Sequence, residues 1–173
     1  KSGKYNSAIE AYNTYFTDGQ FKEKDMEYLI SLAQSYYFTD QFQQSIEVLD
    51  KGLAMEPNNF VLNRLRMYNA SKVNDKENGL AIADKFFKLS TTGSDRFIYQ
   101  DYSAYASILG DAGKYQESID LYNKVLNTEG IEVNKTDIFK EMAPIFTKKG
   151  EPLKAAEYYQ KIIDLAGPDA TAT

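Results

Sequence analysis

Residues 113–119 read Gly-Lys-Tyr-Gln-Glu-Ser-Ile, and similar blocks recur along the chain. Related blocks stand at residues 3–9 (Gly-Lys-Tyr-Asn-Ser-Ala-Ile), 40–46 (Asp-Gln-Phe-Gln-Gln-Ser-Ile) and 150–156 (Gly-Glu-Pro-Leu-Lys-Ala-Ala), with a fainter copy at 77–80. Apolar residues then follow at spacings of three and four, which is typical of an amphipathic helix. One small residue heads each copy, at intervals of 34 to 39 residues: Ala8, Ser45, Gly79, Ser118 and Ala155. A repeat of this length predicts stacked helix pairs that share one continuous core.

The spacing of apolar and breaking residues predicts an all-α chain of about nine helices. We expect these helices near residues 4–17, 25–39, 42–55, 59–72, 76–89, 95–111, 115–127, 136–149 and 151–165. Gly113 and Gly150 should end two of them, because glycine adopts a positive φ at little cost.

A repeat that alternates two helices resembles the tetratricopeptide repeat (TPR) family. The second copy carries the family pattern best, through Leu29, Leu32, Ala33, Tyr36, Ser45, Leu49 and Pro57. The third copy departs from it, because Asn63, Arg66 and Met67 stand where Trp, Leu and Gly are usual. The resemblance implies a right-handed α-solenoid of antiparallel helix pairs.

This resemblance implies a single TPR-like domain over residues 1–167. We expect a partial repeat at residues 1–22, repeats at 26–59, 60–93, 99–132 and 136–167, and a frayed tail at 168–173. The first copy lacks its first helix, so we expect the chain to be a piece of a longer protein.

The composition excludes many kinds of active site. The 173 residues contain no Cys and no His, which rules out thiol nucleophiles, Ser-His-Asp triads, and zinc held by Cys or His. No glycine-rich phosphate loop is present. A net charge of −5 disfavours nucleic acid, and no apolar run approaches the ~18 residues of a membrane helix. The sequence therefore predicts a protein that is not an enzyme, has no cofactor or metal, does not bind nucleic acid and lacks a transmembrane segment.

The chain is rich in tyrosine, with 14 such residues. Six of them fall on motif positions that face the solenoid core: Tyr36, Tyr102, Tyr105, Tyr115, Tyr122 and Tyr159. Tyr37, Tyr68 and Tyr158 fall off those positions and should face elsewhere.

In the TPR family the first helix of each pair lines a concave groove that binds peptides or partner helices. Among the groove positions, we expect Gln34, Tyr37, Arg64, Tyr68, Ser107 and Lys140 to carry binding. Phe38, Ser103 and Glu141 also occupy groove positions. Residues 60–98 hold seven basic and four acidic residues, whereas the segments on both sides are net acidic. This distribution is explained either by an acidic protein or peptide partner or by a simple balance of surface charge.

Three functions stay open at this point. The first is a non-catalytic scaffold that binds a protein or peptide in the groove. The second is carbohydrate capture by a helical-repeat protein of the bacterial cell envelope, with Tyr37, Tyr68 and Gln34 as the sugar-binding group. The third is an architectural spacer. The lack of Cys favours a bacterial periplasm or cell envelope over the cytoplasm.

Overall fold

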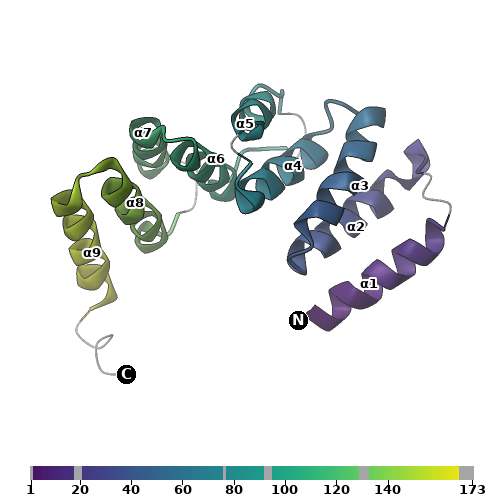
Figure 1. The fold of residues 1–173 in the computed structure, drawn as a ribbon, viewed down its shortest axis with the longest axis horizontal. Helices are drawn as coiled ribbons and strands as arrows, with labels where there is room; N and C mark the ends of the chain where they lie inside the picture. Colours follow the sequence, from purple (N-terminus) through teal and green to yellow (C-terminus); the bar gives the residue numbers. More distant parts are fainter. Residues whose placement is uncertain (1, 18–20, 76, 92–94, 129–132, 168–173) are drawn as a thin grey trace. The chain divides into compact units, whose positions relative to one another are not determined.

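The computed structural model describes residues 2–17, 21–75, 77–91, 95–128 and 133–167, which form nine α-helices and no strand (Figure 1). The helices are α1 (Ser2–Tyr15), α2 (Met26–Phe38), α3 (Phe42–Met55), α4 (Phe60–Val73), α5 (Gly79–Phe87), α6 (Tyr99–Asp111), α7 (Tyr115–Leu126), α8 (Lys135–Lys149) and α9 (Pro152–Ala166). A single 3-10 turn, η1 (Glu23–Asp25), precedes α2. The predicted all-α class is confirmed. The predicted tail at residues 168–173 lies outside the described residues.

Local capping chemistry explains where the helices begin and end. Gly113 and Gly150 have φ values of 78° and 86° after α6 and α8, as their positions predicted. Helix α6 begins at Tyr99, four residues later than predicted. There Ile98 is extended, and its N–H donates to Oδ2 of Asp101 at 2.9 Å, which satisfies a backbone donor ahead of the first turn.

Helix α5 also begins later than predicted, at Gly79 instead of residue 76. The carboxylate of Asp75 accepts a hydrogen bond from the backbone N–H of Asn78 at 3.0 Å, which forms a turn immediately before the helix. This side-chain bond competes with helical hydrogen bonding, so the helix starts only after it.

The small residues that head the repeats lie between paired helices. Ser45, Ser118 and Ala155 are buried, so α3, α7 and α9 approach their partners closely. The Ser45 hydroxyl donates to the carbonyl of Ala33 at 2.8 Å, and the Ser118 hydroxyl donates to the carbonyl of Ala106 at 2.7 Å. The same buried bond thus recurs in two repeats.

The helices group into two compact units, residues 1–95 and 96–173. The core of unit 1 is built mainly from α1 to α4 and includes Leu29, Leu32 and Leu49. The core of unit 2 is built from α6 to α9 and includes Tyr122, Ile138 and Met142. The boundary falls between the third and fourth predicted repeats.

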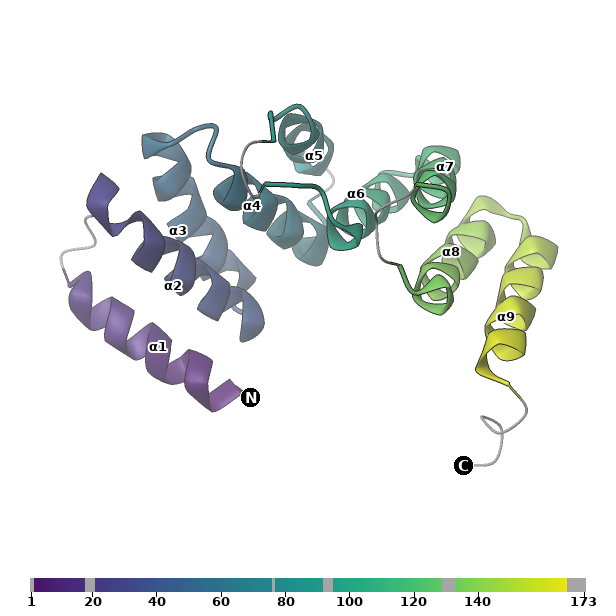
Figure 2. The same cartoon turned by 180° about the vertical axis from the view of Figure 1, so that it is seen from behind.

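Within each unit, the first helices of neighbouring pairs contact each other. Helix α2 contacts α4 in unit 1 (Figure 2), and α6 contacts α8 in unit 2. In the part of the chain that the structure describes, the second helices (α3 with α5, α7 with α9) contact each other less. The first helices therefore line the inner side of each unit.

The predictions for Tyr158 and Tyr159 were wrong. Tyr36 and Tyr122 are buried, and Tyr102, Tyr105 and Tyr115 are half-buried, but Tyr159 is 48% exposed. The neighbouring Tyr158 packs instead against Phe146 and Phe139, with ring centroids 5.0 and 5.3 Å apart. The motif position of Tyr159 becomes buried only where another helix packs on the second helix of the pair.

Candidate protein-binding surface

The predicted binding residues all lie on first helices. Gln34 and Tyr37 are on α2, Arg64 and Tyr68 on α4, Ser107 on α6, and Lys140 on α8. We call the surface formed by α2 and α4 in unit 1, and by α6 and α8 in unit 2, the first-helix face of that unit.

An aromatic row crosses unit 1. It runs from Tyr5 on α1 through Phe38 and Tyr37 on α2 to Tyr68 on α4. Successive ring centroids are 4.9, 5.6 and 6.4 Å apart, within the range of favourable aromatic pairs. The structure therefore brings Tyr37 and Tyr68 together across two repeats, as the groove prediction requires.

The members of the aromatic row differ in exposure. Phe38 is 55% exposed, whereas Tyr37 and Tyr68 are half-buried. Burial, and next the charge of Asp40, raises the pKa of Tyr37 above its ordinary value. Gln34 lies half-buried one helical turn before Tyr37 and can offer an amide beside the rings.

Arg64 lies at the contact between α4 and α5. Its guanidinium is 4.6 Å from the ring centroid of Phe60 and 5.7 Å from that of Phe86. Both rings are buried, and such cation–π contacts favour the folded arrangement. Arg64 therefore packs within unit 1 as well as adding positive charge near the first-helix face.

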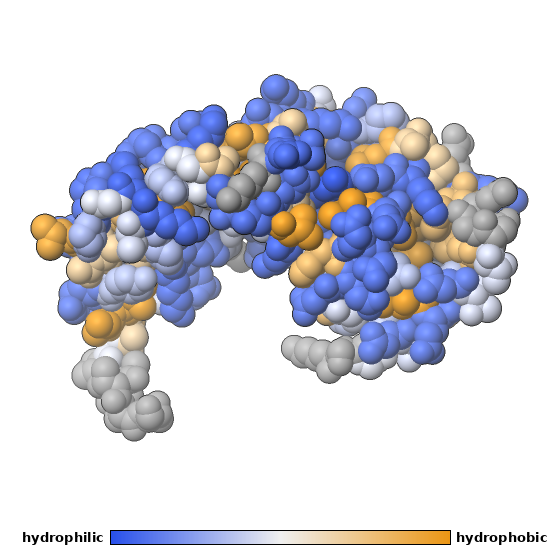
Figure 3. All heavy atoms as spheres, viewed as in Figure 1, coloured by the Kyte–Doolittle hydropathy of each residue, from blue (hydrophilic) through white to orange (hydrophobic). Residues whose placement is uncertain are grey.

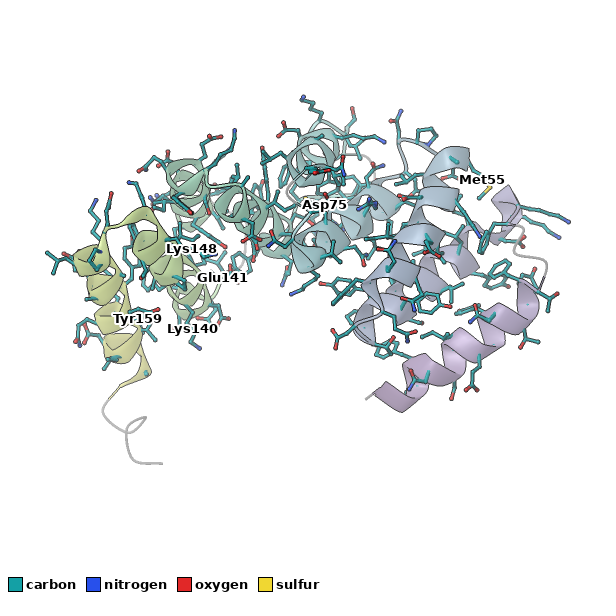
Figure 4. All side chains as sticks on the ribbon, viewed as in Figure 1. Met55, Asp75, Lys140, Glu141, Lys148 and Tyr159 are labelled. Atoms are coloured by element: carbon teal, nitrogen blue, oxygen red, sulfur yellow. The ribbon has the colours of Figure 1, made fainter. Side chains whose placement is uncertain are left out.

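Glu141 is the centre of a polar cluster in unit 2. Its Oε2 atom accepts a hydrogen bond from the hydroxyl of Tyr99 at 3.1 Å and another from the hydroxyl of Ser103 at 2.8 Å. Both donors come from α6, and Glu141 comes from α8 (Figure 4). Burial, followed by the charge and hydrogen bond of Glu141, raises the pKa of Tyr99 and of Tyr122. These tyrosines remain hydrogen-bond donors at neutral pH.

The two predicted residues of unit 2 stand apart from this cluster. Ser107 is exposed on α6, and Lys140 is exposed on α8 with its Nζ atom 3.9 Å from Oδ1 of Asp137. Exposed Lys148 forms a second pair with half-buried Asp111, at 3.6 Å. Such exposed pairs contribute little to stability, so both lysines can exchange partners at low cost.

Sequence reasoning missed Tyr99 and Tyr5. Tyr99 lies four residues before Ser103, which places both hydroxyls on one side of α6. That spacing was readable in the sequence. Tyr5 joins the aromatic row only because α1 packs against α2, which no local pattern reveals.

The described residues hold no group of three His, Cys, Asp or Glu side chains that could bind a metal ion. Among them, no helix is both long and apolar enough to cross a membrane.

Comparison with known proteins supports the repeat assignment. Residues 27–59 match the family model described as tetratricopeptide repeat, which confirms the resemblance seen in the second copy. No curated protein matches the chain.

Several solved structures share the fold. MamA AMB-1 matches with a TM-score of 0.75 at 17% identity, over 95% of this chain and 90% of its own. MamA from Desulfovibrio magneticus RS-1 matches with a TM-score of 0.74 at 15% identity. That match covers 95% of this chain and 86% of the MamA chain. MamA MSR-1 matches with a TM-score of 0.73 at 17% identity, and the match covers 95% of this chain and 88% of the MamA chain. The chain thus has the fold of a TPR-like helical solenoid, an architecture that serves in general as a scaffold for protein interactions.

Proposed function

We propose that this helical-repeat chain is a non-catalytic scaffold that binds a peptide or a partner helix on its first-helix face. The aromatic row of unit 1 carries the proposal. It combines an exposed Phe38 with half-buried Tyr37 and Tyr68, and such partly buried rings are the usual anchors of protein interfaces.

The charges of residues 60–98, around the third repeat, support an acidic partner. This segment contains seven basic and four acidic residues, and Arg64 lies one helical turn before Tyr68. Positive charge beside an aromatic anchor attracts acidic segments and speeds their association.

The test is recovery of partners from the source cell by wild-type chain and by Phe38→Ala. Phe38 is more than half exposed, so its loss should leave the fold intact. Losing an anchor of this kind typically costs about 2 kcal/mol, which corresponds to roughly a 30-fold weaker dissociation constant. The matched control is Glu47→Ala, an exposed change on α3. Equal recovery by Phe38→Ala and wild type would exclude the aromatic row as the binding site.

Carbohydrate capture is the second candidate. The rings of Tyr37 and Tyr68 lie 6.4 Å apart with an interplanar angle of 42°, and Gln34 lies on the same helix as Tyr37. Sugar rings stack on such tyrosines and accept hydrogen bonds from amides. A glycan array that shows binding by wild type and none by Tyr68→Ala, with no protein recovered from cells, would favour this function. No binding in either assay would leave the spacer role.

A further inference from the structure

The contact between first helices is polar in unit 2 and apolar in unit 1. Fully buried residues at one position set the register of the first helices: Ala33, Met67, Ala106 and Ala143. In this register Tyr99 and Glu141, which join α6 to α8, correspond to Met26 of α2 and Leu65 of α4. Met26 and Leu65 are buried in the core of unit 1. The repeat can therefore be built with an apolar pair at these positions, and the fold does not require the carboxylate of Glu141.

The carboxylate of Glu141 is half-buried and is held in one position. Its Oε2 atom accepts hydrogen bonds from the hydroxyls of Tyr99 and Ser103, at 3.1 and 2.8 Å. Two donors on the neighbouring helix hold the side chain in place before any ligand arrives, as a binding site requires. A carboxylate can accept about four hydrogen bonds, so these two leave positions for a further donor.

The charge of Glu141 has no counter-charge. In the part of the chain that the structure describes, no lysine or arginine nitrogen lies within 4.0 Å of its carboxylate. Lys140 and Lys148 of the same helix pair instead with Asp137 at 3.9 Å and with Asp111 at 3.6 Å. Figure 3 shows mainly hydrophilic residues over α6 and α8, which is typical of a surface for polar contacts. Hydroxyl donors stabilise a half-buried carboxylate without neutralising it, so a positively charged group is the complement of Glu141.

We propose that Glu141 binds a lysine or arginine side chain of a peptide partner on the first-helix face of unit 2. This inference rests on the proposed function, because it names the chemistry that one residue of that face recognises. An ammonium or guanidinium group donates several N–H bonds and accepts none, so it fits a carboxylate whose other hydrogen bonds come from hydroxyls.

The probe is a phage-displayed library of random dodecapeptides, selected on the full wild-type chain. The affinity of each selected peptide is then measured by fluorescence anisotropy. Glu141→Gln keeps an oxygen that accepts from Tyr99 and Ser103 but removes the charge. We expect it to weaken a group of peptides by about 10-fold or more, and these peptides should share a lysine or arginine at one position. Asp137→Asn is the matched control, because it removes the same charge from an exposed position one turn earlier on α8, and it should weaken them by less than about 3-fold.

A double-mutant cycle tests the contact itself. Replacing the shared basic residue of the peptide by glutamine should weaken binding to wild type as much as Glu141→Gln does. The same peptide change should have no further effect on Glu141→Gln, since the charged pair is then already absent. Additive losses, or equal losses with Glu141→Gln and Asp137→Asn, would overturn the proposal in favour of a general attraction to the acidic residues of unit 2.

A second variant separates binding from a purely structural role. Tyr99→Met/Glu141→Leu introduces the apolar pair of unit 1, so it should stay folded in a thermal melt but lose the peptides with the shared basic residue. Equal binding by this variant and wild type would refute the proposal. Peptides that Phe38→Ala weakens and Glu141→Gln does not would support the aromatic row of unit 1 and refute the role of Glu141. A library that yields no peptide would contradict both.

Discussion

The buried serines at the head of the repeats allow the repeat register to be tested by measuring stability. Ser118 is fully buried, and its hydroxyl donates to the carbonyl of Ala106. Removing one such bond by Ser118→Ala should lower the free energy of unfolding by about 1 kcal/mol. Ser118→Leu should cost about 1–3 kcal/mol because the larger side chain forces α6 and α7 apart. Urea denaturation measures both.

The control for these serine variants is the adjacent, exposed Glu117. Glu117→Leu should change the free energy of unfolding by less than about 0.5 kcal/mol. A similar loss at residues 117 and 118 would contradict the repeat register.

The tyrosines around Glu141 predict a loss of stability at high pH. Folding raises the pKa of Tyr99 and Tyr122, whereas an unfolded tyrosine titrates near pH ~10. Above that pH the unfolded state binds fewer protons than the folded state. The free energy of unfolding should therefore be unaffected by these groups below pH ~10 and fall as the pH rises through the folded pKa.

The matched variant is Tyr99→Phe/Tyr122→Phe, which removes both titrating groups and keeps the rings. Chemical denaturation from pH ~8 to ~11 should give a shallower decline for this variant than for wild type. Parallel pH dependence of the free energy of unfolding in the two proteins would show that these tyrosines do not cause the loss of stability at high pH.

How well single residues could be predicted depended on their neighbours. The register placed Ser45 and Ser118 correctly, because both contact the preceding helix of their own pair. It misplaced Tyr159, whose burial depends on a helix from a further pair. It also missed Tyr5, since the aromatic row forms only when α1 packs on α2.

Close helix packing leaves no room for a side chain at Gly52 of α3. A Cβ atom added at Gly52 would lie 2.9 Å from the side chains of both Leu29 and Leu62, which are fully buried on α2 and α4. Alanine gains about 1 kcal/mol of helix propensity over glycine, but overpacking costs about 1–3 kcal/mol. We expect Gly52→Ala to destabilise the chain, as measured by its urea midpoint.

Gly3 provides the opposite case for the same substitution. It lies in α1 with no atom within 4 Å of an added Cβ. Gly3→Ala should raise the free energy of unfolding by up to about 1 kcal/mol. A gain at Gly52 that equals the gain at Gly3 would show that α3 can move away from its neighbours.

The order and type of the helices could be predicted because apolar spacing and glycine positions are local signals. The late starts of α5 and α6 could not be predicted. Each depends on a hydrogen bond from a backbone N–H that the carboxylate of Asp75 or Asp101 accepts. Aspartate forms such bonds in turns and at helix starts alike, so its presence does not fix the first helical residue.

The two units have separate cores, and we expect them to open separately. Met142 is fully buried in unit 2, and Met142→Ala should remove about 2–5 kcal/mol of packing there. Hydrogen exchange should then speed up in α6 to α9 and stay unchanged in α1 to α4. Leu29→Ala in unit 1 should give the reciprocal pattern. Faster exchange throughout the chain in either variant would show a single cooperative unit.

The candidate binding surface could be predicted only as a set of helices. The family resemblance assigned the first helices, and the structure places all six expected residues on them. The resemblance could not show that the guanidinium of Arg64 lies over the ring of Phe86, or that the carboxylate of Glu141 lies beside Tyr99. These contacts join residues that are 22 and 42 positions apart.

The contacts between helices join elements that are adjacent or next but one along the chain. Each contact therefore closes only a short loop, and chains with such local contacts fold within microseconds to milliseconds. Residues 1–95 also contain nearly all the partners that their own core needs. Synthesis at about 5–20 residues per second is far slower than that folding. The aromatic row can thus be assembled, and ready to meet a partner, while the ribosome is still adding α6 to α9.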